Sequence, residues 1–105
     1  MDCIILTTCA NRYEAENIAL YLLEEKYAAC VNLMPQITSI YRWEGKIVKE
    51  EEMLVLIKTK VHLFNMIKDT ITNLNIYNVP EVIMIEINQG NKEYLDWLSK
   101  ETLDF

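Results

Sequence analysis

The fold is decided by residues 29–59, which read ACVNLMPQITSIYRWEGKIVKEEEMLVLIKT and are predicted to form one long β-hairpin. The outgoing arm, up to Trp43, is rich in β-branched and aromatic residues, as strands usually are. The chain turns at Glu44 and Gly45, where the glycine supplies the positive φ of a tight hairpin. The return arm ends in an apolar run typical of a strand buried on both faces. Pro35 interrupts the outgoing arm, so this arm lies at a sheet edge or carries a bulge.

The arms of this hairpin are longer than the rest of the chain can cover. Each has about 12 residues or more, against an average of about 5–6 for a strand, and extends roughly 40 Å. Helices of about 15 residues cover only about 22 Å. The far end of the hairpin is therefore expected to lack a cover from its own chain, and it carries Tyr41, Trp43, Ile47 and Val48. Exposed aromatic residues on unpaired strands indicate an interface, so the sequence predicts a homo-oligomer.

The composition is that of a globular protein, and a single domain is predicted to span residues 1–105. A net charge of −6 argues against binding to nucleic acid or acidic lipid, because no basic stripe is present to release counterions. Three cysteines without motif spacing predict reduced thiols and a cytoplasmic location. No apolar run approaches the roughly 18 residues of a membrane span and no leader-like segment opens the chain, so no membrane contact is expected.

The first half of the chain shows a strand followed by an amphipathic helix. Asp2–Thr8 contains the apolar run of a central strand, and Asn11 is expected to cap a helix whose apolar residues recur at helical spacing. Glu14 is placed mostly on the solvent side of that helix. The like-charge run Glu50-Glu51-Glu52 in the return arm is also expected to face water.

The second half repeats the pattern. A helix is expected after Thr59 and ends near residues 73–75, a strand covers Val82–Ile87, and Asn91 caps a short last helix. Connection rules favour a split arrangement in which the third strand pairs between the first and the second. The predicted fold class is therefore α+β, a ferredoxin-like β-α-β-β-α-β sandwich with a long hairpin and an extra C-terminal helix. Both long helices would cover one sheet face, and the other face is left for association.

Several short motifs occur together along the chain: AACVN at 28–32, YRWEGK at 41–46, IKT at 57–59, YNVPE at 77–81, and GN at 90–91 with YLDWL at 94–98. In this combination the chain resembles the CutA-type divalent-ion tolerance proteins over essentially its whole length. The resemblance implies a tight homotrimer, similar in architecture to the PII-type signalling trimers, whose long hairpins pack between protomers. It also implies a role in divalent-metal tolerance, notably of copper, with copper binding in some members. Where the family commonly has a histidine and a carboxylate before the VPE motif, this chain has Asn75 and Asn78.

Few residues suit a metal ion. The chain has no Cys-x-x-Cys and no histidine pair, so a dedicated metal site within one chain is not expected. Cys30 and Met34 share one strand face by alternation, and their sulfur atoms suit Cu(I). The alternative is that they are packed in the interior, as free cysteine and methionine commonly are. The same interior interpretation is preferred for Cys3 and Cys9, and a surface position for His62.

A second candidate site combines aromatic residues of the motifs with one cation and one carboxylate in a cleft between subunits: Tyr41, Trp43, Lys58, Tyr77, Glu81 and Trp97. Aromatic walls with a few polar groups are what a small-molecule site needs. Lys58 follows an apolar run and needs a partner or solvent, and Glu81 is the candidate partner. The alternative is that these side chains only join the protomers, because Tyr and Trp are enriched at interfaces.

No nucleophile elbow, phosphate loop or Ser/His/Asp arrangement is present, so an enzyme is not expected. Together with the resemblance, the sequence predicts a cytoplasmic homotrimer with a function in divalent-metal (copper) tolerance. Any contact with a divalent metal ion would be weak or shared between subunits. The alternative is a PII-like trimer that senses a small ligand or acts as a scaffold for another protein.

Overall fold

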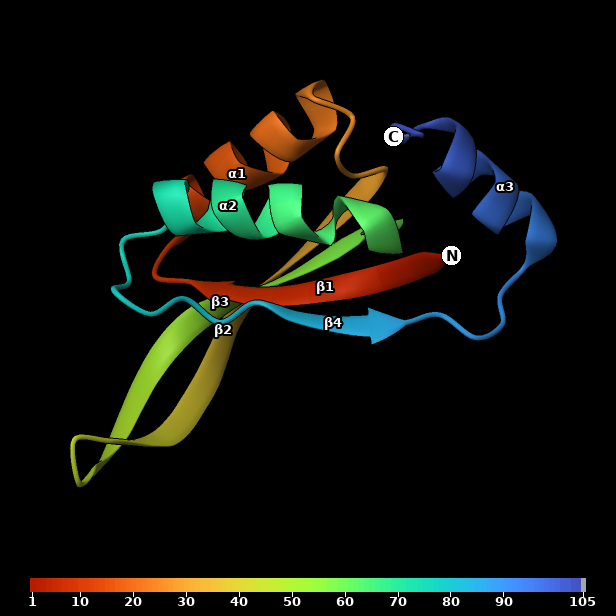
Figure 1. The fold of residues 1–105 in the computed structure, drawn as a ribbon. Helices are drawn as coiled ribbons and strands as arrows, with labels where there is room; N and C mark the ends of the chain where they lie inside the picture. The colour runs from red at the N-terminus through yellow and green to blue at the C-terminus, as the bar shows by residue number, and fades with distance from the viewer. Residues whose placement is uncertain (105) are drawn as a thin grey trace.

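The computed structural model describes residues 1–104, and Phe105, the last residue of the predicted domain, lies outside this range. The elements follow in the order β1 (Asp2–Cys9), α1 (Arg12–Glu24), β2 (Cys30–Trp43), β3 (Lys46–Lys60), a 3-10 turn (Val61–Leu63), α2 (Phe64–Leu74), β4 (Ile83–Glu86) and α3 (Lys92–Lys100). The strands form one sheet in the order β2-β3-β1-β4, and α1 and α2 cover one of its faces (Figure 1). All strand pairs are antiparallel. The predicted ferredoxin-like α+β arrangement, with the third strand between the first and the second, is confirmed.

Helix α1 begins where the sequence predicts. The Asn11 side chain accepts a hydrogen bond from the backbone N–H of Glu14 at 2.9 Å, as an N-cap does. The prediction for the Glu14 side chain is wrong, because this residue is only 7% exposed. Its Oε2 accepts the backbone N–H of Ile76 at 3.3 Å, so the carboxylate turns toward the loop after α2 instead of toward water.

The hairpin is regular except at one point. Its strands pair from Cys30 opposite Lys58 to Trp43 opposite Lys46, and Glu44 and Gly45 both have positive φ, as a type I′ turn requires. The register shifts between Met34 and Ile37, where β2 holds one residue more than β3. Pro35 therefore marks a bulge, and β2 is also the edge strand of the sheet, as the proline predicts.

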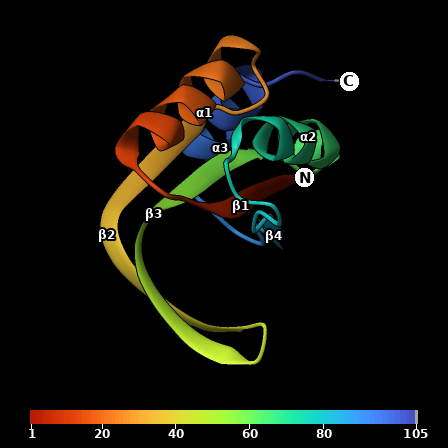
Figure 2. The same ribbon diagram turned by 90° about the vertical axis from the view of Figure 1, so that its left-hand side faces the viewer.

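The two faces of the sheet differ in what covers them. Ile5, Val55 and Ile57 point toward α1 and α2 and are fully buried. The alternate residues of the same strands form the other face, which we call the open face, and they include Ile4, Leu6, Leu54, Leu56, Ile83 and Ile85. Ile83 and Ile85 are 50% and 52% exposed. No helix among residues 1–104 lies on this face (Figures 1 and 2), so the prediction of one uncovered face is confirmed.

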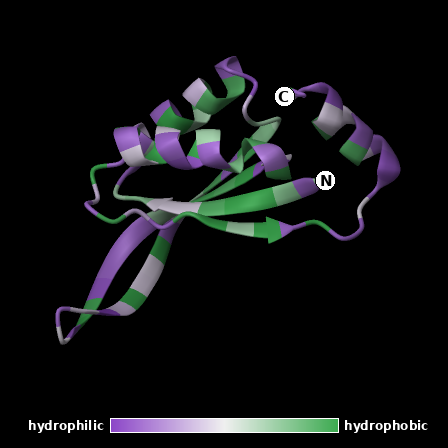
Figure 3. Cartoon of the chain, viewed as in Figure 1, coloured by the Kyte–Doolittle hydropathy of each residue, from purple (hydrophilic) through white to green (hydrophobic). Residues whose placement is uncertain are grey.

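The outer half of the hairpin extends away from the body and curls beneath the open face (Figure 2). It makes the molecule elongated, with extents of 44 × 25 × 22 Å. Trp43 and Ile47 are 50% and 66% exposed near its tip, so the predicted lack of cover is confirmed. Figure 3 shows that β3 becomes hydrophilic over its outer half, with apolar segments again near the turn.

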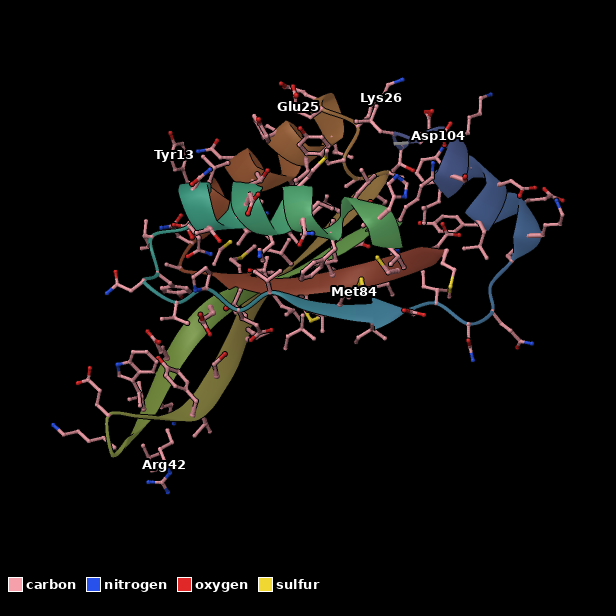
Figure 4. The ribbon with its side chains drawn as sticks, viewed as in Figure 1. Tyr13, Glu25, Lys26, Arg42, Met84 and Asp104 are labelled. Carbon is pink, nitrogen blue, oxygen red and sulfur yellow. The ribbon has the colours of Figure 1, made fainter. Side chains whose placement is uncertain are left out.

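The C-terminal segment closes the opposite end of the sheet. Leu98 of α3 is fully buried, and the buried Lys60 ammonium donates to the backbone carbonyls of Thr102 and Leu103. It also forms an ion pair with Asp104 at 2.7 Å, and the N–H of Leu103 donates to the carbonyl of Lys26 nearby (Figure 4). Across residues 1–104, every helix is too short or too polar to span a membrane.

Candidate functional site

A pocket of about 550 Å³ lies between the outer hairpin, the end of β1 and the loop after α2. The hairpin contributes aromatic, aliphatic and acidic side chains, and the loop adds another aromatic ring and another carboxylate. The lining residues are Thr8, Ser39, Ile40, Tyr41, Trp43, Glu50, Glu52, Tyr77, Asn78, Val79 and Glu81. The pocket therefore joins two segments that are far apart in the sequence.

The loop that carries Tyr77 is fixed by Asn75. The buried Asn75 amide donates from Nδ2 to the carbonyl of Thr8 at 3.0 Å, and its Oδ1 accepts the backbone N–H of Tyr77 at 2.8 Å. The Glu14 carboxylate accepts a hydrogen bond from the backbone N–H of Ile76, which lies between Asn75 and Tyr77. Asn75 thus links the end of β1 to the loop, and both polar ends of its side chain are occupied within the chain.

Two tyrosine–glutamate hydrogen bonds line the pocket. The Tyr77 hydroxyl donates to Glu52 Oε2 at 2.6 Å, and the Tyr41 hydroxyl donates to Glu50 Oε1. Burial, together with the bond to Glu52, raises the pKa of Tyr77 above its ordinary value. The bond to Glu50 raises the pKa of Tyr41 to about 12, helped by burial and by nearby carboxylates. Both hydroxyls therefore remain protonated donors at neutral pH.

The prediction that the acidic run Glu50-Glu51-Glu52 faces water is wrong for Glu52. Glu50 and Glu51 are exposed, as expected, but Glu52 is only 8% exposed because the hairpin folds its side chain toward Tyr77. Partial burial and then the charge of Glu52 raise the pKa of Glu81, whose side chain remains partly exposed. The pocket thus holds three carboxylates, and its lining within the described chain includes no Lys, Arg or His.

Four of the six residues predicted for a ligand cleft line this pocket: Tyr41, Trp43, Tyr77 and Glu81. The other two, Lys58 and Trp97, lie elsewhere, beside Tyr94 of α3. The Lys58 ammonium is 5.6 Å from the centroid of the Tyr94 ring, and the rings of Tyr94 and Trp97 are 5.4 Å apart. Lys58 forms no ion pair with Glu81 within residues 1–104, so the expected pairing is absent from the single chain.

The sulfur atoms are divided between the interior and the open face. Cys3 and Cys9 are fully buried, as predicted, and burial is the first cause that raises the pKa of Cys3 to about 11 and of Cys9 to about 12. Cys30 is partly buried with its thiol 3.8 Å from Asn32 Oδ1. Met34 is 51% exposed, so neither Cys30 nor Met34 is packed in the interior of the single chain.

In the part of the chain that the structure describes, no three side chains among His, Cys, Asp and Glu are arranged to hold a metal ion. His62 is exposed, as predicted. Within residues 1–104, no group of His, Cys, Asp and Glu side chains completes a metal site at the predicted pair of Cys30 and Met34.

Comparison with known proteins decides the family. The family model described as CutA1 divalent ion tolerance protein matches residues 3–101. The chain belongs to the CutA1 divalent ion tolerance family. The resemblance indicated by the sequence motifs is thereby confirmed.

The CutA1 relatives are similar to this chain in sequence and in fold. The divalent-cation tolerance protein CutA of Thermus thermophilus is 45% identical over 97% of this chain and 99% of its own, and its solved structure has a TM-score of 0.94. The structure of CutA1 from Oryza sativa has a TM-score of 0.95 at 36% identity, covering 99% of this chain and 95% of its own. Human protein CutA is 45% identical over 90% of this chain, which spans 53% of the human protein.

Sequence reasoning missed the residues that organise the CutA1 pocket in this chain. From the sequence, Asn75 is noted only because the family commonly has a histidine at this position. Glu14 and Glu52 are both predicted to face solvent. One signal was available for Glu52: strand alternation places Glu50 and Glu52 on one side of β3 and Glu51 on the other, so the run faces two environments.

Proposed function

We propose that this protein serves divalent-cation tolerance as a homotrimer without enzymatic activity. The observation that supports the proposal is the large apolar surface that a single chain leaves uncovered. This surface is the open face of the sheet, beneath which the hairpin curls (Figure 2). The outer hairpin adds the exposed Trp43 and Ile47 near its turn, on opposite sides of the ribbon. Monomeric proteins rarely expose apolar patches of this kind, and a second and third copy would bury them.

The number of three subunits comes from the resemblance to the family. The geometry of the single chain supports association but does not specify how many copies associate. Sedimentation tests the proposal directly. A homotrimer gives one species near three times 12.4 kDa over the micromolar range. A stable monomer at these concentrations contradicts it.

We further propose that metal contact, with copper as the favoured ion, is shared between subunits. Cys30 and Met34 lie on the open face, which is the face that association covers, so a neighbouring chain would supply the remaining ligands. A thiolate with a thioether suits Cu(I). A cytoplasmic location is part of the proposal, because an odd number of cysteines without motif spacing favours a reducing compartment.

Copper titration of the reduced protein tests this metal site. Cys30→Ala and Met34→Leu should each weaken binding. The matched control is Met84→Leu, because Met84 lies on β4 and faces the helices with Ile5. An isotherm that is unchanged by Cys30→Ala removes this thiol as a ligand.

A second function, the sensing of a small ligand, is favoured by the pocket between the hairpin and the loop. A volume of about 550 Å³ with three aromatic side chains is in the range of small-molecule sites. A thermal-shift screen across nucleotides, amino acids and amines tests it, and the absence of any stabilising compound counts against sensing. In that case the scaffold alternative, in which the hairpins are displayed to another protein, gains support.

A further inference from the structure

The pocket between the outer hairpin and the loop after α2 has an unbalanced charge. Glu50, Glu52 and Glu81 line it, and none of the ion pairs within residues 1–104 involves any of them. The nearest cations along the chain do not compensate. Lys46 and Lys49 are outside the lining, and strand alternation directs Lys49 to the opposite side of the hairpin from Glu50. The Arg42 side chain points outward from the tip of the hairpin (Figure 4).

Among the three carboxylates of the pocket, Glu52 is the one whose burial indicates a need for a cation. It is more than nine-tenths buried, and its Oε2 accepts the hydrogen bond of the Tyr77 hydroxyl. Its other oxygen, Oε1, accepts no hydrogen bond from residues 1–104, and the residue lines the pocket. A buried carboxylate without a cationic partner is costly, so a cation that enters the pocket gains the interaction that the chain itself does not provide.

The remaining walls select the kind of cation. Tyr41, Trp43 and Tyr77 place three aromatic residues around the pocket, and Ile40 and Val79 are also part of its lining. Aromatic faces attract ammonium groups through their quadrupole, and they pack against the apolar body of an organic molecule. A bare metal ion uses neither property. The three carboxylates are also not arranged as a metal-ligand group in the described chain.

We infer that this pocket binds an organic ammonium ion, with the ammonium group at Glu52 and its apolar body between the aromatic side chains. This inference rests on the proposed ligand-sensing function and specifies its ligand class. A neutral compound of the same shape would leave the carboxylate unpaired, so it should bind more weakly. An anion should be repelled.

Tryptophan fluorescence can follow binding at this site. Trp43 and Trp97 are the two tryptophans, and Trp97 lies at α3, so Trp97→Phe leaves Trp43 as the reporter within the pocket. The probes are 2-phenylethylammonium and the neutral 2-phenylethanol, which share a shape and differ in charge. We expect the ammonium to bind at least about tenfold more tightly than the alcohol. Equal binding of the two probes overturns the inference.

Variants then locate the charge that is responsible. Glu52→Gln should reduce ammonium binding about tenfold or more and leave the alcohol unchanged. Glu24→Gln, on the exposed surface of α1, is the matched control and should change neither. Glu81→Gln is a second variant in case Glu52→Gln fails to fold, and it should weaken ammonium binding in the same direction. Ammonium binding that is unaffected by a folded variant at Glu52 or Glu81 overturns the inference.

The thermal-shift screen separates this inference from the sensing function on which it rests, because a stabilising compound that carries no ammonium group supports sensing and overturns only the inference. The reporter samples separate the inference from the proposed assembly. Sedimentation of the reporter protein reports assembly independently of ligand. An intact oligomer that binds neither probe overturns the ammonium inference alone, whereas a dissociated chain overturns the proposed assembly. Titration with Zn²⁺ alone covers the metal alternative: binding that is tighter than that of the ammonium and is lost in Glu52→Gln would assign the pocket to metal and overturn the inference.

Discussion

The inner and outer halves of β3 belong to the same strand, yet they meet opposite environments. Val55 and Ile57 are fully buried beneath α1 and α2, whereas Ile47 is 66% exposed near the hairpin turn. The inner half is held by side-chain packing. The outer half is held within the single chain mainly by pairing with β2 and by the turn at Glu44 and Gly45. A two-stranded ribbon of this kind is at best marginally stable alone, which is the physical reason for the proposed association.

The largest effect should come from truncating the inner half. Ile57→Ala is expected to lower the free energy of unfolding by about 2–5 kcal/mol, because it leaves a cavity in the core. Ile47→Ala should change the stability of the single chain by less than about 0.5 kcal/mol. Denaturant unfolding at several protein concentrations distinguishes the two, since the loss in Ile57→Ala is present at every concentration. A loss in Ile47→Ala that does not depend on concentration would break the comparison.

The second effect concerns association. Trp43→Ala should weaken the oligomer by about 2 kcal/mol or more, because buried tryptophans are frequent hot spots of interfaces. The fold of each chain should persist, since Trp43 is half exposed and outside the core. Sedimentation and circular dichroism on the same sample give the two readouts. Loss of helix content while the oligomer stays intact would be the opposite of the expected result.

The two tyrosine–glutamate pairs repeat the comparison at the level of single hydrogen bonds. Tyr77→Phe leaves the buried Glu52 without its donor and should cost about 1–3 kcal/mol. Tyr41→Phe removes the equivalent bond to the exposed Glu50, where water replaces the hydroxyl, and should cost less than about 0.5 kcal/mol. Thermal unfolding measures both. Similar losses in the two variants would show that the outer hairpin is also shielded from water.

The smallest effect is the pH dependence of Glu81. Burial and the nearby Glu52 raise its pKa above the ordinary 4.5, so the folded state favours the protonated carboxyl. The stability that it contributes is present below pH 4.5 and is lost as the pH rises through the raised value. Glu81→Gln should therefore be slightly more stable than the natural chain at pH 7, by at most about 0.5 kcal/mol because the side chain is partly exposed. The difference should vanish near pH 4, and a gain of equal size at both pH values would exclude this origin.

The sequence predicts the fold well because the signals that determine it are local. The proline of the bulge, the glycine of the turn, the asparagine caps and the helical spacing each act within a few residues. Alternation along the strands then separates the covered face from the open face. The uncovered hairpin follows from simple lengths, since strands rise more than twice as far per residue as helices.

The candidate site is predicted only in part, because its decisive contacts join distant positions. Glu14 meets Ile76 across 62 residues, and Asn75 meets Thr8 across 67. Helical periodicity assigns Glu14 to solvent, and it cannot register that a loop will lie across the start of α1. For the same reason the aromatic residues of the hairpin are predicted together with Trp97, although α3 places that side chain beside Tyr94, at the other end of the sheet.

The bulge at Pro35 also sets the direction of everything beyond it. A single surplus residue in β2 redirects the outer ribbon, and Gln36 accommodates it with a φ of 57°. Shortening β2 by one residue at this point would restore an uninterrupted ladder and aim Tyr41 and Trp43 along a different path, with every side chain unchanged. The direction of the outer hairpin is thus governed by chain length at one position, so an insertion or deletion there would redirect Tyr41 and Trp43 together, which a single point substitution on the hairpin surface would not do.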